Sequence, residues 1–236
     1  IVKIIYAIAT AKWLQNDLIT ESEEVYRALS DMITHSSNDA TSYIVDILTG
    51  TNSGPSLEDN NWQIWQKQRE VINKWLQTFN WPELENVNCV QKTWGDGPYG
   101  RDKDFYGENN KNRNVLSTAS IARIYEALMT NSLLPKKATT DLKGYLRRSL
   151  DKSIRIKNPE NQIDGFLGEG LTESSQLWSK AGLMSEVRHD VGWWIVKGNN
   201  PMLAVVFTKG NKLSKDTNLL PSIASEFNKY NSIFNI

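Results

Sequence analysis

The first fifteen residues constrain the fold more than any other segment. Residues Ile1–Gln15 read IVKIIYAIATAKWLQ, a run that lacks glycine and proline and is apolar nearly all round. A helix with apolar side chains on every side is buried in the centre of a domain. Lys3 lies in the first turn of this run, among isoleucine, valine and tyrosine. We therefore expect a central buried helix that carries one amine, and a natural sequence that begins earlier, because a buried helix seldom starts a chain without a cap.

Length and charge narrow the class of protein. A chain of 236 residues with 39% apolar residues is expected to form one domain over residues 1–236. The 27 basic residues balance the 27 acidic ones, so charge gives no argument for a nucleic-acid partner. No apolar run approaches the ~18 residues of a transmembrane helix. The single cysteine, Cys89, and two separated histidines fit no disulfide or metal site, so no metal is expected.

The pattern along the chain changes from helix to strand. Helical periodicity predicts helices at residues 1–15, 21–33, 40–48, 62–79, 115–129, 141–153 and 222–234. Runs rich in Trp, Val and Ile predict strands at 177–183, 191–197 and 202–208, the last two joined by a hairpin. Helices followed by adjacent antiparallel strands and a final helix predict an α+β fold, in which an antiparallel sheet packs against helices.

Two polar stretches lie outside this pattern. Residues 81–114 are glycine-rich and lack periodicity, which is typical of a functional or mobile loop. A basic cluster is interpreted as the solvated face of the predicted helix 141–153 and its continuation. Its members are Arg147, Arg148, Lys152, Arg155 and Lys157.

Three short segments carry residues suited to acyl transfer. These are Lys3, the turn Ser36-Ser37-Asn38, and Lys180-Ala181-Gly182 on the first predicted strand. A serine nucleophile needs a neighbouring base, and a lysine desolvated in an apolar helix has a lowered pKa that suits this role. A spacing of three places serine and lysine on one helix face. Each segment also has a structural interpretation, as a snorkelling lysine, a helix terminus and an exposed strand end.

Together and in this order, the segments resemble the S-x-x-K, S-D-N and K-T-G motifs of class A β-lactamases and penicillin-binding D-Ala-D-Ala peptidases. Residues 1–16 are similar to the family's nucleophile helix, and 32–48 to its S-D-N helix, with Ser37 in place of the acid. Residues 177–206 resemble its K-T-G strand and the next two strands. The family's N-terminal helix and first strands have no counterpart in this sequence, and its serine would directly precede Ile1.

The resemblance implies a role for each motif residue. Lys3 would be the base, Ser36 a proton shuttle, Asn38 a ligand of the substrate carbonyl and Lys180 the anchor for a substrate carboxylate. These four residues and the substrate would meet in one cleft.

Three further residues are implied in substrate binding. Gly182 and Leu183 follow Lys180 on the strand, and the backbone N–H of Leu183 would form half of the oxyanion hole. Arg188 would assist carboxylate binding, with an exposed strand-end charge as the alternative.

The implied function is that of a penicillin-recognising serine hydrolase, β-lactamase-like or D-Ala-D-Ala carboxypeptidase-like, that forms an acyl-enzyme with β-lactams or cell-wall peptides. By resemblance we expect a monomer outside the cytoplasm, periplasmic or secreted, that needs no cofactor. The alternative is a non-catalytic binding homologue without the nucleophile.

One element of the class A β-lactamases is missing from the sequence. Their omega loop carries an acid followed by two residues and Leu-Asn, and residues 92–114 lack this pattern. Asp102 lies nearest the expected place. Without a positioned base, acylation can proceed while deacylation stalls.

Overall fold

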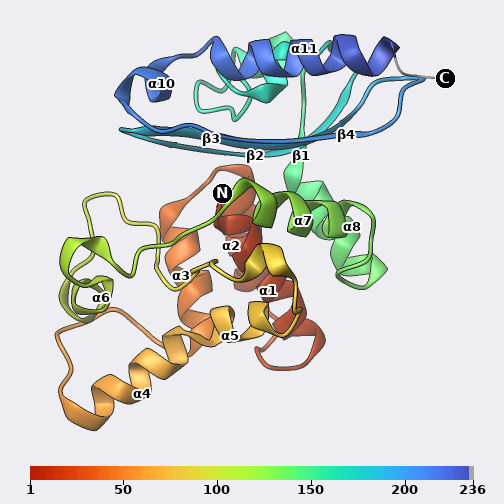
Figure 1. Cartoon of the computed structure of the whole chain (residues 1–236). Coiled ribbons are helices and arrows are strands. Elements are labelled where there is room, and N and C mark those ends of the chain that lie inside the picture. Colours follow the sequence, from red (N-terminus) through yellow and green to blue (C-terminus); the bar gives the residue numbers. More distant parts are fainter. Residues whose placement is uncertain (234–236) are drawn as a thin grey trace. The chain divides into compact units, whose positions relative to one another are not determined.

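The computed structural model describes residues 1–233 and divides them into two compact units. One unit comprises Val2–Ser120, and the other comprises Ile1 together with the residues from Ile121 onward. Figure 1 shows the helices of the first unit and the sheet of the second.

The helical unit is built around α1, as the sequence predicts. Ten of the thirteen residues of α1 are buried, and α2 and α3 pack against it (Figure 1). The helices are α1 (Lys3–Gln15), α2 (Glu23–Thr34), α3 (Asn38–Thr49), α4 (Asp59–Arg69), α5 (Val71–Gln77) and α6 (Gly100–Tyr106), with 3-10 turns η1 (Pro82–Leu84) and η2 (Glu108–Asn110). The helix predicted at residues 62–79 is therefore two helices, α4 and α5.

In addition to the 3-10 turns η1 and η2, the loop predicted between residues 81 and 114 contains one α-helix, α6. Its first residue, Gly100, has φ +49°, and a Cβ there would lie 2.1 Å from the carbonyl oxygen of Gly54. The neighbouring Arg101 N–H donates to that same oxygen at 3.1 Å. Only glycine allows the backbone to approach so closely, so this contact fixes where α6 begins.

The second unit contains the sheet. Its elements are α8 (Lys136–Leu146), β1 (Arg147–Arg148), α9 (Lys152–Arg155), η3 (Leu167–Gly170), β2 (Gln176–Met184), β3 (Val187–Ile195), β4 (Met202–Phe207), α10 (Asn211–Lys215) and α11 (Leu219–Ile233), and α7 (Thr118–Met129) spans the boundary between the units. The strands are antiparallel in the order β1-β2-β3-β4. The three predicted strands and the α+β class are confirmed.

One face of the sheet packs against α11, which runs along it in Figure 1. Leu177 and Trp194 of the sheet form one buried core with Leu220 and Ala224 of α11. The indole N–H of Trp194 donates to Asn228 Oδ1 at 2.7 Å. The helix predicted at 222–234 is thus confirmed, although Phe234 lies outside the described residues. No helix among residues 1–233 is both long and apolar enough to span a bilayer.

The prediction for residues 141–153 is wrong. The helix ends at Leu146, and Arg147 and Arg148 form β1 instead. The guanidinium of Arg148 is buried and donates to the carbonyl of Ser179 at 3.2 Å, while Arg155 pairs with Asp164. The basic cluster is therefore not a single solvated helix face, because two of its members have specific partners.

Candidate active site

The predicted site residues fall into two groups, one in each unit. Lys3, Ser36 and Asn38 belong to the helical unit, and Lys180, Gly182, Leu183 and Arg188 belong to the sheet unit.

The structure brings the three residues of the helical group into direct contact. Lys3 Nζ donates to the carbonyl oxygen of Ser36, to Asn38 Oδ1 at 2.9 Å and to the Ser37 carbonyl at 3.2 Å. The hydroxyl oxygen of Ser36 lies 3.3 Å from the same nitrogen. A lysine near the chain start and a turn more than thirty residues later therefore form one polar cluster on the buried helix.

Local backbone geometry produces this cluster. The chain turns sharply between α2 and α3, and Ser36 adopts a left-handed φ of +56°. Ser37 then caps α3, since its hydroxyl accepts the N–H of Ala40 at 3.1 Å. This arrangement turns the carbonyls of Ser36 and Ser37 toward Lys3.

The environment of Lys3 suits a general base. The residue is 5% exposed, and burial lowers the pKa of its amine from 10.5 to about 8. All four oxygens around it belong to neutral groups. With that pKa, about one tenth of the amine is neutral at pH 7, which leaves a lone pair available to accept a proton.

A network that sequence reasoning missed fixes the polar loop beside α1. The hydroxyl of Tyr6, one turn after Lys3, donates to the carbonyl of Gln91 at 2.6 Å. The side-chain amide of Asn114 donates to that carbonyl at 2.9 Å and to Tyr6 Oη at 3.2 Å, and its oxygen accepts the N–H of Val90 at 3.0 Å. Asn114 thus links residues 90 and 91 of the loop to Tyr6 of α1, a role that a single asparagine does not reveal in the sequence.

Asp102, the acid nearest the expected omega-loop position, lies in a buried ion-pair network. One of its oxygens accepts a hydrogen bond from Arg69, and both side chains are completely buried. Arg69 Nη1 also lies 3.8 Å from Asp46 Oδ1, and the other oxygen of Asp46 forms an ion pair with Lys92 Nζ at 2.7 Å. The carboxylate of Asp102 therefore holds α6 against α4. The other acids of residues 92–114 are exposed; they are Asp96, Asp104 and Glu108.

The sheet group centres on Lys180 in the middle of β2. Its side chain has no exposed surface, and Nζ donates to Gln162 Oε1 at 2.5 Å and to the carbonyl of Ala181 at 2.7 Å. The same Gln162 oxygen accepts the backbone N–H of Ala181 at 3.2 Å. Gln162 thus contacts the predicted site residue Lys180, a contact that a lone glutamine in a loop does not reveal in the sequence.

The backbone of β2 presents an edge beyond its short partner strand. β1 pairs only with Leu177 and Trp178, and no other strand of the described residues pairs on that side. Because backbone groups alternate along a strand, the N–H of Leu183 points to the same edge as that of Ala181. Leu183 is 56% exposed. At Gly182, a Cβ would lie 3.3 Å from the backbone nitrogen of Ile1, so a side chain there would be crowded.

Arg188 is buried, so it is not the exposed strand-end charge of the alternative interpretation. Its guanidinium donates to the carbonyls of Ser214 at 2.9 Å and Gly165 at 3.1 Å and lies 4.9 Å from the ring centre of Phe166. These contacts join β3 to two neighbouring segments. A role of Arg188 in binding a substrate carboxylate stays a prediction. It would require the guanidinium to exchange its hydrogen bonds to these carbonyls for hydrogen bonds to the carboxylate.

A buried carboxyl group lies on β3, in the strand next to Lys180. Asp190 Oδ2 accepts the N–H of Leu167 at 3.0 Å. Burial raises the pKa of Asp190 to about 7, although the positive charges of Lys180 and Arg148 act in the opposite direction. The polar residues around Asp190 hid the first half of β3 in the sequence, so the predicted strand began four residues too late.

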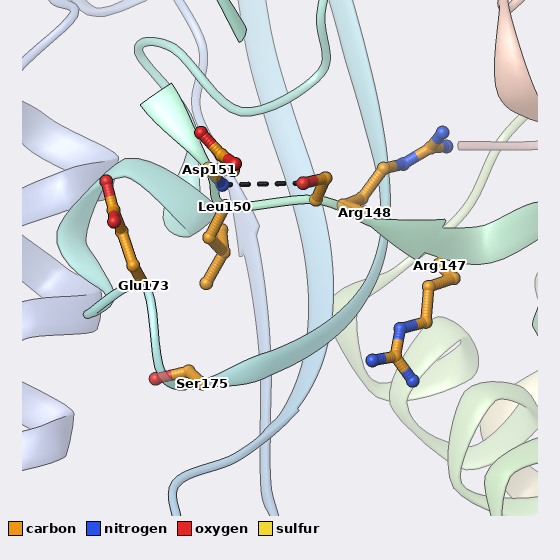
Figure 2. A pocket seen from close by; sticks show the side chains of 7 residues that line it. Arg147, Arg148, Leu150, Asp151, Glu173 and Ser175 are labelled. Carbon is orange, nitrogen blue, oxygen red and sulfur yellow. Dashed lines mark hydrogen bonds between the residues drawn. The ribbon is translucent and has the colours of Figure 1, made fainter. Parts of the chain in front are cut away.

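A pocket of about 460 Å³ lies elsewhere in the sheet unit (Figure 2). Its lining consists of Arg147, Arg148, Ser149, Leu150, Asp151, Glu173 and Ser175. None of the predicted site residues lines it, so the pocket does not carry the predicted chemistry. Among residues 1–233, no group of three or more His, Cys, Asp or Glu side chains is placed to hold a metal ion.

Comparisons with solved structures find the same fold. The protein PBP-A is 16% identical, with 97% of this chain and 80% of that chain covered and a TM-score of 0.62. A PBP-A variant in an acyl-enzyme complex with penicillin G is 14% identical, with 97% and 79% covered and a TM-score of 0.65. A β-lactamase from Streptosporangium roseum is 15% identical, with 99% and 83% covered and a TM-score of 0.64.

The sequence itself identifies the family. A search of curated proteins finds no match. A family model described as the beta-lactamase enzyme family matches residues 14–231, which is most of the chain. The chain therefore belongs to the beta-lactamase enzyme family.

Proposed function

We propose that this protein is a penicillin-recognising serine hydrolase that forms an acyl-enzyme with β-lactams or D-Ala-D-Ala peptides. The observation that carries the proposal is the buried amine of Lys3, whose pKa is lowered to about 8 and which contacts both Ser36 and Asn38. Membership of the beta-lactamase enzyme family and the shared fold support the same chemistry.

In this proposal the nucleophile is a serine three positions before Lys3, directly preceding Ile1. The neutral amine of Lys3 accepts the serine proton as the hydroxyl attacks the substrate carbonyl. The hydroxyl of Ser36, 3.3 Å from Lys3 Nζ, passes a proton to the leaving nitrogen. Asn38 accepts from Lys3 through Oδ1, so its NH₂ group is left to donate to a substrate carbonyl.

We also assign roles to residues of the sheet unit. Lys180 attracts a carboxylate, and the N–H of Leu183 on the β2 edge stabilises the oxyanion that develops during acyl transfer. Because cell-wall peptides lie outside the cytoplasm, we propose that the protein works there.

We further propose that the acyl-enzyme formed with β-lactams is long-lived. Fast hydrolysis needs a base that activates water, and Asp102, the acid nearest the omega-loop position in the sequence, is committed to Arg69 in a completely buried pair. The protein would then trap penicillin more readily than it destroys it, as a peptidase does.

A fluorescent penicillin tests the acylation step. The full-length protein is incubated with the probe, denatured and resolved by electrophoresis, beside a variant in which alanine replaces the residue that precedes Ile1. We expect a covalent adduct with the wild type and none with the variant. If the wild type forms no adduct but binds penicillin reversibly, the protein is a binding homologue and the enzymatic proposal is wrong.

A chromogenic cephalosporin tests deacylation. We expect one rapid burst of colour, equal to the enzyme concentration, followed by slow turnover. Sustained fast turnover without a burst would show that an efficient water-activating base is present.

A further inference from the structure

The segment around α9 reverses the usual placement of charged and apolar side chains. Ile154 and Ile156 are 53% and 80% exposed. Arg155 stands between them in the sequence, yet its side chain is only 11% exposed and its guanidinium pairs with Asp164. Proteins in water normally bury isoleucine and expose arginine. The outer face of this segment therefore suits contact with an apolar environment outside the protein.

Specific hydrogen bonds hold the segment in this conformation. Arg155 Nε donates to Asp164 Oδ1 at 2.9 Å. The side-chain amide of Asn161 donates to the other oxygen of Asp164 and to the carbonyl of Asn158, both at 2.8 Å. These bonds hold Arg155 inward, so the exposure of the two isoleucines beside it is part of the folded structure.

A second segment with an exposed aliphatic side chain is linked to α9. It is α10, in which Leu213 is 39% exposed. Arg188 joins the two segments, since its guanidinium donates to the carbonyls of Ser214 in α10 and of Gly165. Gly165 directly follows Asp164, the partner of α9.

Residues 151–165 and 209–216, which we call the α9–α10 surface, present lysines to an external partner. Five lysines of this surface are exposed, and none forms an ion pair within the part of the chain that the structure describes; they are Lys152, Lys157, Lys209, Lys212 and Lys215. Three of its four acids are engaged by Arg155 or by backbone N–H groups; they are Asp164, Asp151 and Asp216. The fourth acid is Glu160. Positive charge therefore predominates among the groups that a partner would meet.

Aliphatic side chains interspersed with lysines match the surface of an anionic phospholipid bilayer. Such a surface accepts isoleucine at the boundary between headgroups and acyl chains, while lysine side chains extend to the headgroup phosphates. A protein partner fits less well, because protein–protein interfaces are depleted of lysine.

We propose that the α9–α10 surface docks the protein on anionic phospholipid membranes, with Ile154 and Ile156 inserted among the lipids and the lysines bound to headgroup phosphates. The inference is independent of the proposed function, because neither Lys3 nor Lys180 belongs to this surface. It concerns where the protein works rather than which bond it breaks.

The test is cosedimentation of the full-length protein with vesicles. One set of vesicles contains equal parts of phosphatidylglycerol and phosphatidylcholine, and the other contains phosphatidylcholine alone. The variants are Ile154→Ser, Ile156→Ser and the double variant Lys152→Gln with Lys157→Gln. Leu18→Ser is the matched control, because Leu18 is 63% exposed and belongs to the helical unit. Thermal unfolding of each variant reports whether it folds.

We expect the wild type and Leu18→Ser to bind the phosphatidylglycerol vesicles equally well, and at least about tenfold more strongly than the phosphatidylcholine vesicles. Each isoleucine variant should lower the partition coefficient by at least about fivefold, since one aliphatic side chain no longer enters the lipid. The double lysine variant should lower it by about tenfold on the anionic vesicles alone. Should Ile156→Ser not fold, Ile154→Ser decides by the same ratio.

A wild type that binds neither set of vesicles, or binds both equally, overturns the inference. Isoleucine variants that fold and bind as strongly as Leu18→Ser overturn it as well. Sedimentation velocity without lipid tests the rival occupant: a dimer that Ile156→Ser dissociates would assign the surface to a second copy of this chain and not to a membrane.

Discussion

Replacing each of two adjacent serines is expected to separate chemistry from stability. Ser36 touches Lys3 through its hydroxyl but has a left-handed backbone, whereas the hydroxyl of Ser37 accepts the N–H of Ala40 and caps α3. We predict that Ser36→Gly folds normally and loses acylation. We predict that Ser37→Ala is less stable and acylates normally.

The magnitudes follow from the local geometry. At φ +56°, glycine relieves a backbone cost of about 1 kcal/mol for Ser36, and its greater freedom in the unfolded chain costs about 0.5–1 kcal/mol, so the two effects nearly cancel. Removing the cap hydroxyl of Ser37 should lower the free energy of unfolding by about 1 kcal/mol. Loss of a proton-transfer group should slow acylation by about 10²-fold.

Urea unfolding followed by circular dichroism gives the stabilities, and the rate of labelling by a fluorescent penicillin gives the acylation rates. The reasoning is refuted if Ser36→Gly labels at the wild-type rate. It is also refuted if Ser37→Ala slows labelling as much as Ser36→Gly does, because the turn itself would then matter rather than the Ser36 hydroxyl.

Three further predictions concern titrating and buried groups. The acylation rate should rise with pH with a midpoint near 8 as Lys3 loses its proton. Lys3→Arg, whose guanidinium stays charged, should abolish that rise and lower the rate by about 10²-fold. A wild-type rate that is independent of pH between 6 and 9 would contradict the role of Lys3. Burial raises the folded-state pKa of Asp190 from 3.8 to about 7, so the folded protein binds this proton more tightly than the unfolded chain does. The free energy of unfolding should therefore fall as the pH rises from 4 to 7. The melting temperature of Asp190→Asn should fall less over this range than that of the wild type. Arg69→Met should lower the free energy of unfolding in urea by about 3–5 kcal/mol, because it leaves Asp102 unpaired. The double variant Arg69→Met with Asp102→Leu should recover a large part of this loss. Equal losses in the single and double variants would show that the pair is not coupled.

The parts of the fold that follow a simple period were predictable from the sequence. The apolar run of α1, the Trp-containing second half of β3, the apolar strand β4 and the final helix each follow such a period, and Trp194, Ala204 and Leu220 lie together in one buried core. The turn that carries Ser36 and Asn38 was predictable for a similar reason, since turn-forming residues interrupt two amphipathic helices.

The missed features depend on partners far along the chain. Gln162 and Arg148 are polar, yet both are buried because they bond Lys180 and Ser179, which are 18 and 31 residues away. The same holds for Asp190, which made the start of β3 look like a loop. Periodicity reports only whether a segment has an apolar face, so it cannot identify a polar side chain whose burial is compensated by a distant group.

The edge of β2 has a consequence for the behaviour of the protein in solution. A strand edge with unpaired backbone groups is a template for intermolecular strand addition, which leads to aggregation. Here the guanidinium of Arg148 donates a hydrogen bond to the Ser179 carbonyl, and the side-chain oxygen of Gln162 accepts one from the Ala181 N–H. Two side chains thus protect the part of the edge that precedes Leu183. A further strand would have given the same protection, but it would also have closed this edge to a peptide-like ligand.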